Sequence, residues 1–216
     1  KLTKDTNGDG ITDQWGLAWG VLDVNPNTMY PFVWQGGADI LTQDGQMNAL
    51  SEHGAIGFHF MKKLASDGIA PEGGLHPSPA TLFFEGRAGM LIAPAPLIPI
   101  LKRDFPNLPF STAIMPQGPA TNFWEGRGTF GNSGFWVMSA STQHLRKAFQ
   151  LLSFITALEQ AQKMIQITRL FSARLDWQEP ENDPRLKTFV VGRRFLVPYP
   201  LHPRLRLIHT SIMAEV

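Results

Sequence analysis

The segment over residues 5–13 carries oxygen side chains at spacings that proteins use to bind calcium. The residues that match positions 1, 3, 5, 6, 7 and 9 of an EF-hand loop are Asp5, Asn7, Asp9, Gly10, Ile11 (through its carbonyl) and Asp13. Position 12 holds Gly16 instead of the bidentate Glu, and no pair of helices is predicted around the loop. Two interpretations stay open: a polar turn held by its own Asx hydrogen bonds, or a calcium site with a structural role.

Aromatic side chains lie in or beside predicted loops instead of at regular core spacing. They are Trp15, Trp19, Tyr30, Trp34, Trp124 and Trp136. A sugar has an apolar face that a flat aromatic ring can cover, and a hydroxyl rim that Asn, Gln, Asp and backbone amides can bind. Core packing explains any one of these side chains, but for the set we expect at least two rings to line a ligand cleft.

Carboxylates that could act in acid–base chemistry are Asp39, Glu85, Asp104 and Glu125. A glycosidase needs two carboxylates facing each other across a sugar, and Glu125 is the candidate that stands beside a tryptophan. The sequence has no Gly-x-Ser-x-Gly elbow, no lysine in its glycine-rich segment over 126–134, and no zinc-ligand spacing among its histidines. A secreted carbohydrate-active enzyme using Glu125 and a second carboxylate is therefore the alternative to a binding protein, not the leading hypothesis.

Composition narrows the class of protein further. The 216 residues carry 19 Lys and Arg against 18 Asp and Glu, and a net charge of +1 gives no field that would favour nucleic acid. The chain has no cysteine, which excludes a disulfide scaffold and a thiol nucleophile. No apolar run reaches the roughly 18 residues of a membrane helix. The basic stretch over 185–206 is interpreted as a solvated helix face.

Helices and strands are predicted to alternate, which indicates an α/β fold. Ser51 is expected to cap a helix over 52–67, and Ser78 with Pro79 to start a second one that ends near residue 85. Asp44-Gly45 predicts a hairpin turn. Further helices are predicted over 96–103, 142–155, 156–168 (from a capping box at Thr156) and 183–195, and strands over 90–92, 110–115 and 135–138.

Four stretches, which together span nearly the whole chain, carry a resemblance to a known family. They are residues 32–40 with Asp44-Gly45, 64–71, 83–92, and 131–139 with the helices that follow. The third, Phe-Phe-Glu-Gly-Arg-Ala-Gly-Met-Leu-Ile, is the most specific, because it is similar to an F-x-x-G-k-a-A-M segment. In this order the stretches resemble the extracellular solute-binding proteins of family 1, the sugar-binding subunits of bacterial ABC importers.

The resemblance implies two α/β lobes with the ligand in the cleft between them. Residues 1–131 are expected to form the α/β core of the second lobe, residues 132–175 the hinge strand and helices contributed to the first lobe, and residues 176–216 the return to the second lobe. The signal or lipoprotein segment and most of the first lobe would lie upstream of Lys1. The helices over 143–168 should then lack their partner sheet and expose an apolar surface.

The resemblance also points to a set of ligand-binding residues. They are Tyr30, Trp34, Gln35, Trp124, Gly131, Asn132 and Ser133. Many members of the family carry a Gly-Pro-Trp whose tryptophan stacks on the sugar. This chain has Ala93-Pro-Ala-Pro96 at that place, so the ring is lost or moved and the ligand stays open.

The implied function is capture of a carbohydrate and its delivery to an ABC permease in the membrane. Two hinges, near residues 131–133 and 171–174, would let the lobes close on the ligand. We expect no catalytic residue, no nucleic acid partner and no cofactor other than a calcium ion. The complete protein is expected to be a monomer, periplasmic or extracellular, and anchored as a lipoprotein. The alternatives are the glycosidase fragment and a calcium-stabilised structural module.

Overall fold

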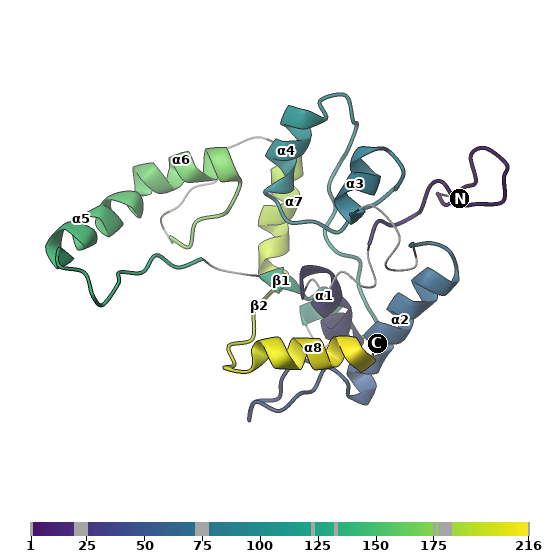
Figure 1. Cartoon of the computed structure of the whole chain (residues 1–216), viewed down its shortest axis with the longest axis horizontal. Helices are drawn as coiled ribbons and strands as arrows, with labels where there is room; N and C mark the ends of the chain where they lie inside the picture. Colours follow the sequence, from purple (N-terminus) through teal and green to yellow (C-terminus); the bar gives the residue numbers. More distant parts are fainter. Residues whose placement is uncertain are drawn as a thin grey trace.

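The computed structural model describes residues 2–19, 26–71, 78–121, 124–131, 134–174, 176 and 183–215. The described elements, in chain order, are α1 (Pro26–Gly36), α2 (Glu52–Ser66), α3 (Pro79–Phe84), α4 (Leu97–Asp104), the short helix η1 (Trp124–Gly126), β1 (Thr129–Gly131), α5 (Leu145–Ile155), α6 (Leu158–Thr168), α7 (Pro184–Gly192), η2 (Arg193–Phe195), β2 (Leu196–Pro198) and α8 (Leu205–Glu215). Most of them surround α1 and the two strands, while α5 and α6 stand apart at one side (Figure 1). The mixture of helix and strand confirms the predicted α/β class.

The two strands pair in parallel, although α5, α6 and α7 lie between them in the chain. Thr129 pairs with Leu196, Phe130 with Val197 and Gly131 with Pro198. Both strands therefore end at the same edge. A Cβ added to Gly131 would lie 3.1 Å from the Cβ of Leu196, so this strand end leaves little room for a larger residue.

The aromatic run over 30–34 is part of helix α1, which also accommodates Pro31 within its length. Tyr30, Val33 and Trp34 have 0% exposed surface, so α1 forms the centre of the hydrophobic core. Buried residues from the other elements and connecting segments complete this core; they are Trp19, Ile40, Ala49, Phe58, Met61, Val197 and Ile212.

Helix α2 packs against α1 at a distance that only glycine permits. A Cβ added to Gly57 would lie 2.3 Å from the carbonyl oxygen of Phe32, and one added to Gly36 would lie 2.5 Å from that of His53. Both distances are far below van der Waals contact, so the two backbones touch at these positions. The glycines therefore fix how closely the central helix pair can approach.

The predicted helix starts are confirmed where a side chain caps the first turn. Ser51 accepts from Gly54 N (3.4 Å), Ser78 accepts from Thr81 N (3.3 Å), and Asp183 accepts from Arg185 N (3.0 Å). Each cap satisfies a backbone N–H that has no partner within its helix. The predicted capping box at Thr156 is wrong: Ala157 is the N-cap residue of α6, and the Thr156 hydroxyl donates to Leu152 O in the preceding helix.

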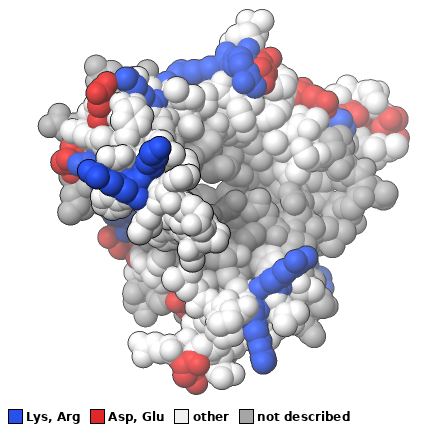
Figure 2. All heavy atoms as spheres, turned by 60° about the vertical axis from the view of Figure 1, so that its left-hand side comes forward, with Lys and Arg blue, Asp and Glu red and all other residues white. Residues whose placement is uncertain are grey.

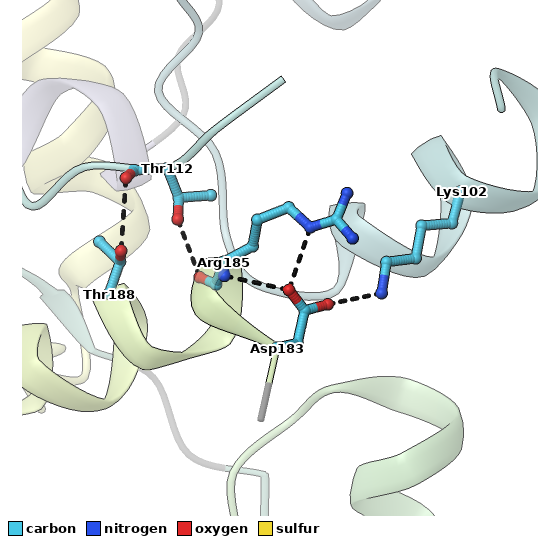
Figure 3. Close-up of polar contacts among 5 residues, drawn as sticks. All are labelled: Lys102, Thr112, Asp183, Arg185 and Thr188. Carbon is cyan, nitrogen blue, oxygen red and sulfur yellow. Dashed lines mark hydrogen bonds and ion pairs between the residues drawn. The ribbon is translucent and has the colours of Figure 1, made fainter. Parts of the chain in front are cut away.

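Asp183 also joins α7 to its neighbours (Figure 3). Its carboxylate accepts hydrogen bonds from Lys102 of α4 and from the Arg185 side chain. Burial alone raises the pKa of this carboxyl, but these bonds and that from Arg185 N outweigh it and lower the pKa to about 2. Thr112 adds a second connection: its hydroxyl donates to Arg185 O, and its carbonyl accepts from the Thr188 hydroxyl. Asp183 therefore holds the start of α7 in place.

The three strands predicted over 90–92, 110–115 and 135–138 are wrong. Leu91 makes an isolated bridge to Ala18, and the rest of these described residues form no regular strand. Segment 110–115 lies against α7, where Thr112 bonds to helix residues instead of a strand. In segment 135–138, Phe135 and Val137 are each 82% exposed, and this apolar run does not form the predicted strand.

The predicted hairpin turn is confirmed. Leu41 and Met47 form an antiparallel bridge, and Thr42 N donates to Gln46 O across the turn. Gly45 has φ 80°, a left-handed conformation that suits glycine. Helix α8, in contrast, was not predicted, although it supplies the buried Ile212 to the core.

Helices α5 and α6 expose the apolar surface that the sequence predicts. None of the residues of α5, all of them described, is buried. The large apolar side chains exposed in this part of the chain are Phe135, Trp136, Val137, Met138, Leu145, Phe149, Leu151, Phe154, Met164, Ile167 and Leu170. An apolar surface of this extent is typical of a face that another protein surface covers.

Candidate functional site

The carboxyl ends of β1 and β2 meet where the chain leaves the second strand. Gly131 ends β1 and Pro198 ends β2. The next residue, Tyr199, donates its backbone N–H to Gly131 O (3.2 Å). Ligands of α/β proteins bind beyond the carboxyl ends of parallel strands, so this edge is the candidate site.

Aromatic rings from separate parts of the chain gather beside this edge. The Tyr199 ring stacks on Tyr30 at a centroid distance of 6.1 Å and an interplanar angle of 28°. Phe130 of β1 meets Tyr199 edge to face at 5.4 Å and lies 6.4 Å from Tyr30. His209 of α8 approaches the Tyr30 ring to 5.8 Å. Elements α1, β1, β2 and α8 thus position one cluster of rings (Tyr30, Phe130, Tyr199 and His209), which we call the strand-end cluster.

The buried member of the strand-end cluster is held by a hydrogen bond. The Tyr30 hydroxyl bonds to Nδ1 of His209 at 3.2 Å. Burial, together with the nearby Tyr199, raises the pKa of the Tyr30 phenol well above its usual range. Tyr30 therefore remains a neutral phenol at physiological pH.

In the structure the rings of the predicted aromatic residues Tyr30, Trp34 and Trp124 contact one another in series. Trp34 contacts Tyr30 edge to face at 5.6 Å and Trp124 at 6.2 Å. Its Nε1 donates to Asp39 Oδ1 (3.1 Å). Tyr30 and Trp34 have no exposed surface, whereas Trp124 is only partly buried. Contact of these three rings with a ligand stays a prediction.

The remaining predicted binding residues have different surroundings. Gln35 is 7% exposed; its backbone carbonyl accepts from Ala120 N (3.1 Å), and its side-chain Nε2 has no hydrogen-bond partner among the described residues. Gly131 lies at the strand edge, as described above. Asn132 and Ser133 lie outside the described residues.

Trp124 and Glu125 lie at the opposite, amino end of the strand pair, before β1 begins. Their φ values are 45° and 52°, and Gly126 follows with φ 67°. A non-glycine residue in this region costs about 1–3 kcal/mol, so the surrounding structure must hold this turn in place. The Glu125 carboxylate is 69% exposed and lies 3.9 Å from the Arg194 guanidinium.

Each carboxylate considered for acid–base chemistry has a structural partner. Asp39 accepts from Trp34 Nε1 and Ile40 N, Glu85 pairs with Arg87, Asp104 pairs with Arg103, and Glu125 pairs with Arg194. The Arg103 hydrogen bond lowers the pKa of Asp104. Asp39 therefore holds the buried Trp34 in place, whereas the ion pairs of Glu85, Asp104 and Glu125 are exposed to solvent.

The loop over residues 5–13 binds its own backbone through its carboxylates. Asp5 accepts from Gly8 N (2.6 Å) and Gly10 N (2.8 Å), and Asp13 accepts from the hydroxyl and N–H of Thr6. The bonds from Gly10 and Gly8 lower the pKa of Asp5, and those from Thr6 lower the pKa of Asp13. Asp9 accepts from Ile11 N, and Asn7 accepts from Asp9 N.

The metal prediction for this loop stays open. Across the residues that the structure describes, no group of three or more His, Cys, Asp or Glu side chains lies close enough to hold a metal ion. The observed bonds are those of the Asx-turn interpretation. Calcium binding by Asp5, Asn7, Asp9, Ile11 and Asp13 stays a prediction.

Sequence reasoning missed Tyr199 and His209 as members of the candidate site. Tyr199 is one of only two tyrosines in the chain and stands between Pro198 and Pro200 directly after an apolar run. That setting is a signal for an ordered strand end. The position of Tyr199 beside Tyr30, far away in the sequence, follows only from the fold.

Comparison with known proteins supports the same fold. The chain is similar to a Brucella abortus (strain 2308) protein described as a binding protein, with 29% identity over 130 residues, which are 58% of this chain and 30% of that protein. It superposes on the maltose/maltodextrin-binding domain MalE from Bdellovibrio bacteriovorus, bound to maltotriose, with a TM-score of 0.76 and 24% identity, covering 99% of this chain and 56% of that chain. It also superposes on the GacH receptor of Streptomyces glaucescens, which was solved in complex with acarbose, with a TM-score of 0.75 and 17% identity, covering 94% of this chain and 53% of that chain.

These matches show the fold of the chain and how much of the longer proteins it covers. The chain spans about half the length of these solved structures and has their α/β fold. Within the described part of the chain, no helix combines the length and apolarity needed to cross a membrane. The family described as bacterial extracellular solute-binding protein matches residues 5–188, which are most of the chain. The chain therefore belongs to the bacterial extracellular solute-binding protein family.

Proposed function

We propose that this chain is part of a substrate-binding protein that captures a carbohydrate and delivers it to an ABC importer. The observation that carries the proposal is the family match over residues 5–188. The two solved structures with the same fold are described as bound to maltotriose and to acarbose, which are both oligosaccharide-like ligands. The ligand of this chain would belong to the same chemical class.

The candidate site suits a carbohydrate better than it suits a charged ligand. Aromatic rings lie at the carboxyl ends of β1 and β2, where they can cover the apolar face of a sugar. The face seen from the α5–α6 side is hollowed near its centre, and its described Lys, Arg, Asp and Glu side chains form separate small groups instead of one charged patch (Figure 2). A neutral ligand that is bound by stacking and hydrogen bonds suits such a surface.

The exposed apolar face of α5 and α6 supports the two-lobed arrangement. In this proposal residues 1–131 and 176–216 belong to the second lobe, and residues 132–175 cross to a first lobe that covers the face. Phe149 and Phe154 of α5 are 61% and 59% exposed, as expected for side chains that meet a partner surface outside these residues. The cleft would lie between the lobes and close by a hinge motion near residues 131–133 and 171–174.

Location and partners follow from this function. The protein would act outside the cytoplasmic membrane, in the periplasm or on the cell surface, with a lipoprotein anchor upstream. Its closed, loaded form would be presented to the importer permease. No chemical step is required, since the ligand is released unchanged.

The proposal is tested by measuring ligand binding to the complete protein with both lobes, which we call the two-lobed protein. The panel is maltotriose, acarbose and glucose, with glycerol 3-phosphate as the charged comparison. A ligand at 100 times its dissociation constant adds about 2.7 kcal/mol to the free energy of unfolding, which raises the melting temperature measurably. We expect a saturable rise with at least one carbohydrate and an unchanged carbohydrate after incubation. A rise with glycerol 3-phosphate alone would exclude the carbohydrate class, and cleavage of maltotriose would favour the glycosidase.

A further inference from the structure

We propose that Tyr199 contacts the ligand, as the ring at the carboxyl ends of β1 and β2 that a sugar covers. This inference rests on the proposed function and adds a specific binding residue to it. Tyr199 was not among the residues expected from the sequence. Its position, its ring contacts and its flanking prolines support the role independently.

The backbone of Tyr199 is fixed at the strand edge. The residue follows β2 directly, and its N–H donates to the carbonyl of Gly131, the last residue of β1. Tyr199 therefore lies beside the end of β1, at the edge where ligands of α/β proteins bind.

The Tyr199 ring stands between the core and the surface. Its stacking partner Tyr30 has 0% exposed surface, whereas Tyr199 itself is partly buried. Tyr30 lies against one face of the Tyr199 ring, and Phe130 meets the ring edge to face. The surface that Tyr199 keeps is thus backed by packed rings, and its hydroxyl can bond to the hydroxyl rim of a sugar while the ring covers the apolar face.

The supports of Tyr199 are rigid. Tyr30 is held by its hydroxyl bond to His209 of α8. Pro198 and Pro200 flank Tyr199, and a residue before proline is restricted to extended conformations. A ring that is already ordered loses less conformational entropy when a ligand binds, so Tyr199 is a pre-organised contact.

The test measures maltotriose and acarbose binding to the two-lobed protein by calorimetry, with the melting temperature of each unliganded variant as a second readout. For whichever probe binds the unmodified protein, Tyr199→Ala should weaken affinity about tenfold or more, since an aromatic contact of this kind is worth at least about 1.4 kcal/mol in total. Tyr199→Trp keeps a stacking ring and should bind within about threefold of the unmodified protein, whereas Tyr199→Phe should lose only the contribution of the hydroxyl.

Phe60→Ala is the matched control. Phe60 is a 51% exposed ring on α2 that packs on the buried Phe32 at 6.0 Å, so its loss removes a similar packing contact away from the strand ends. It should lower the melting temperature and leave affinity unchanged. Unchanged affinity of Tyr199→Ala, or an equal loss in Phe60→Ala, would overturn the inference while the proposed function stands. If neither probe nor glucose binds the unmodified protein, both proposals are wrong.

Discussion

Two helix pairs in this molecule differ in how far their apolar faces are buried. Helices α1 and α2 meet at the centre of the core, where Tyr30, Val33 and Trp34 have no exposed surface. Helices α5 and α6 are also amphipathic, but α5 buries none of its residues, and Phe149 is 61% exposed. Helical periodicity creates an apolar face in both pairs, yet among the described residues the face of α5 stays exposed and α6 buries only Ile165.

The difference also appears in the closeness of packing. Gly36 and Gly57 let the backbones of α1 and α2 touch, and a Cβ at either position would overlap a main-chain oxygen. The connection to α5 and α6 contains Gly134, where an added Cβ has no described heavy atom within 4 Å. The α1–α2 pair is therefore sensitive to a single added methyl group, whereas the segment that leads to α5 is not.

The largest effect is expected from Gly57→Ala, which breaks the tight pair. Its Cβ would lie 2.3 Å from Phe32 O, so the helices must separate and the core around Trp34 must loosen. We expect a loss of about 3 kcal/mol in the free energy of unfolding, at the upper end of overpacking effects. Urea unfolding monitored by circular dichroism measures it. The control is Gly134→Ala, which should be neutral; equal losses in the two variants would contradict this account of the glycines.

The second-largest effect is expected at Asp183, at the start of α7, the helix that follows α6 in the chain and precedes β2. Asp183 has a pKa of about 2 in the folded protein, below the ordinary value of 3.8, so its contribution is present above pH 4 and is lost as the pH falls from about 4 to 2. The difference in pKa corresponds to about 2 kcal/mol. Asp183→Asn keeps a helix-capping side chain but removes the charge. It should lower stability by about this amount at pH 7 and flatten the pH dependence between 4 and 2. A variant with the same acid profile as the unmodified protein would show that other carboxylates govern it.

A smaller effect on stability is expected from substitutions on the exposed face of α5. The double substitution Phe149→Ser and Phe154→Ser changes exposed rings of α5, so the free energy of unfolding of the 216-residue chain should change by less than about 0.5 kcal/mol. Self-association of that chain, measured by sedimentation velocity, should decrease because the apolar face is smaller. In the two-lobed protein the same variant should melt at a lower temperature. Unchanged melting there would mean that no lobe covers this face.

The smallest effect is expected at the loop over residues 5–13. Its carboxylates already accept backbone hydrogen bonds, for example from Gly8 N and Gly10 N to Asp5. Removing calcium with a chelator should therefore change the free energy of unfolding by less than about 0.5 kcal/mol, as at an ordinary surface position. A chelator-dependent loss well above that value, abolished by Asp9→Asn, would establish the calcium site instead.

The sequence by itself determined the features that depend on neighbouring residues. Ser51, Ser78 and Asp183 start helices because each cap bonds to a backbone N–H within three residues. The turn at Gly45 follows from local conformational preference. The apolar face of α5 and α6 could be predicted for the same reason, since it needs only helical spacing within one segment.

Only the tertiary structure decided the features that need a distant partner. The strand predicted over 110–115 failed because that segment bonds to α7, whereas β1 and β2 pair although α5, α6, α7 and η2 lie between them in the chain. The sequence marked Tyr30 and Trp34 as aromatic but could not predict that both are fully buried on one helix, and the contact of Tyr199 with Tyr30 followed only from the fold. The physical reason is that strand pairing and burial depend on contacts between residues far apart in the chain, which no local pattern encodes.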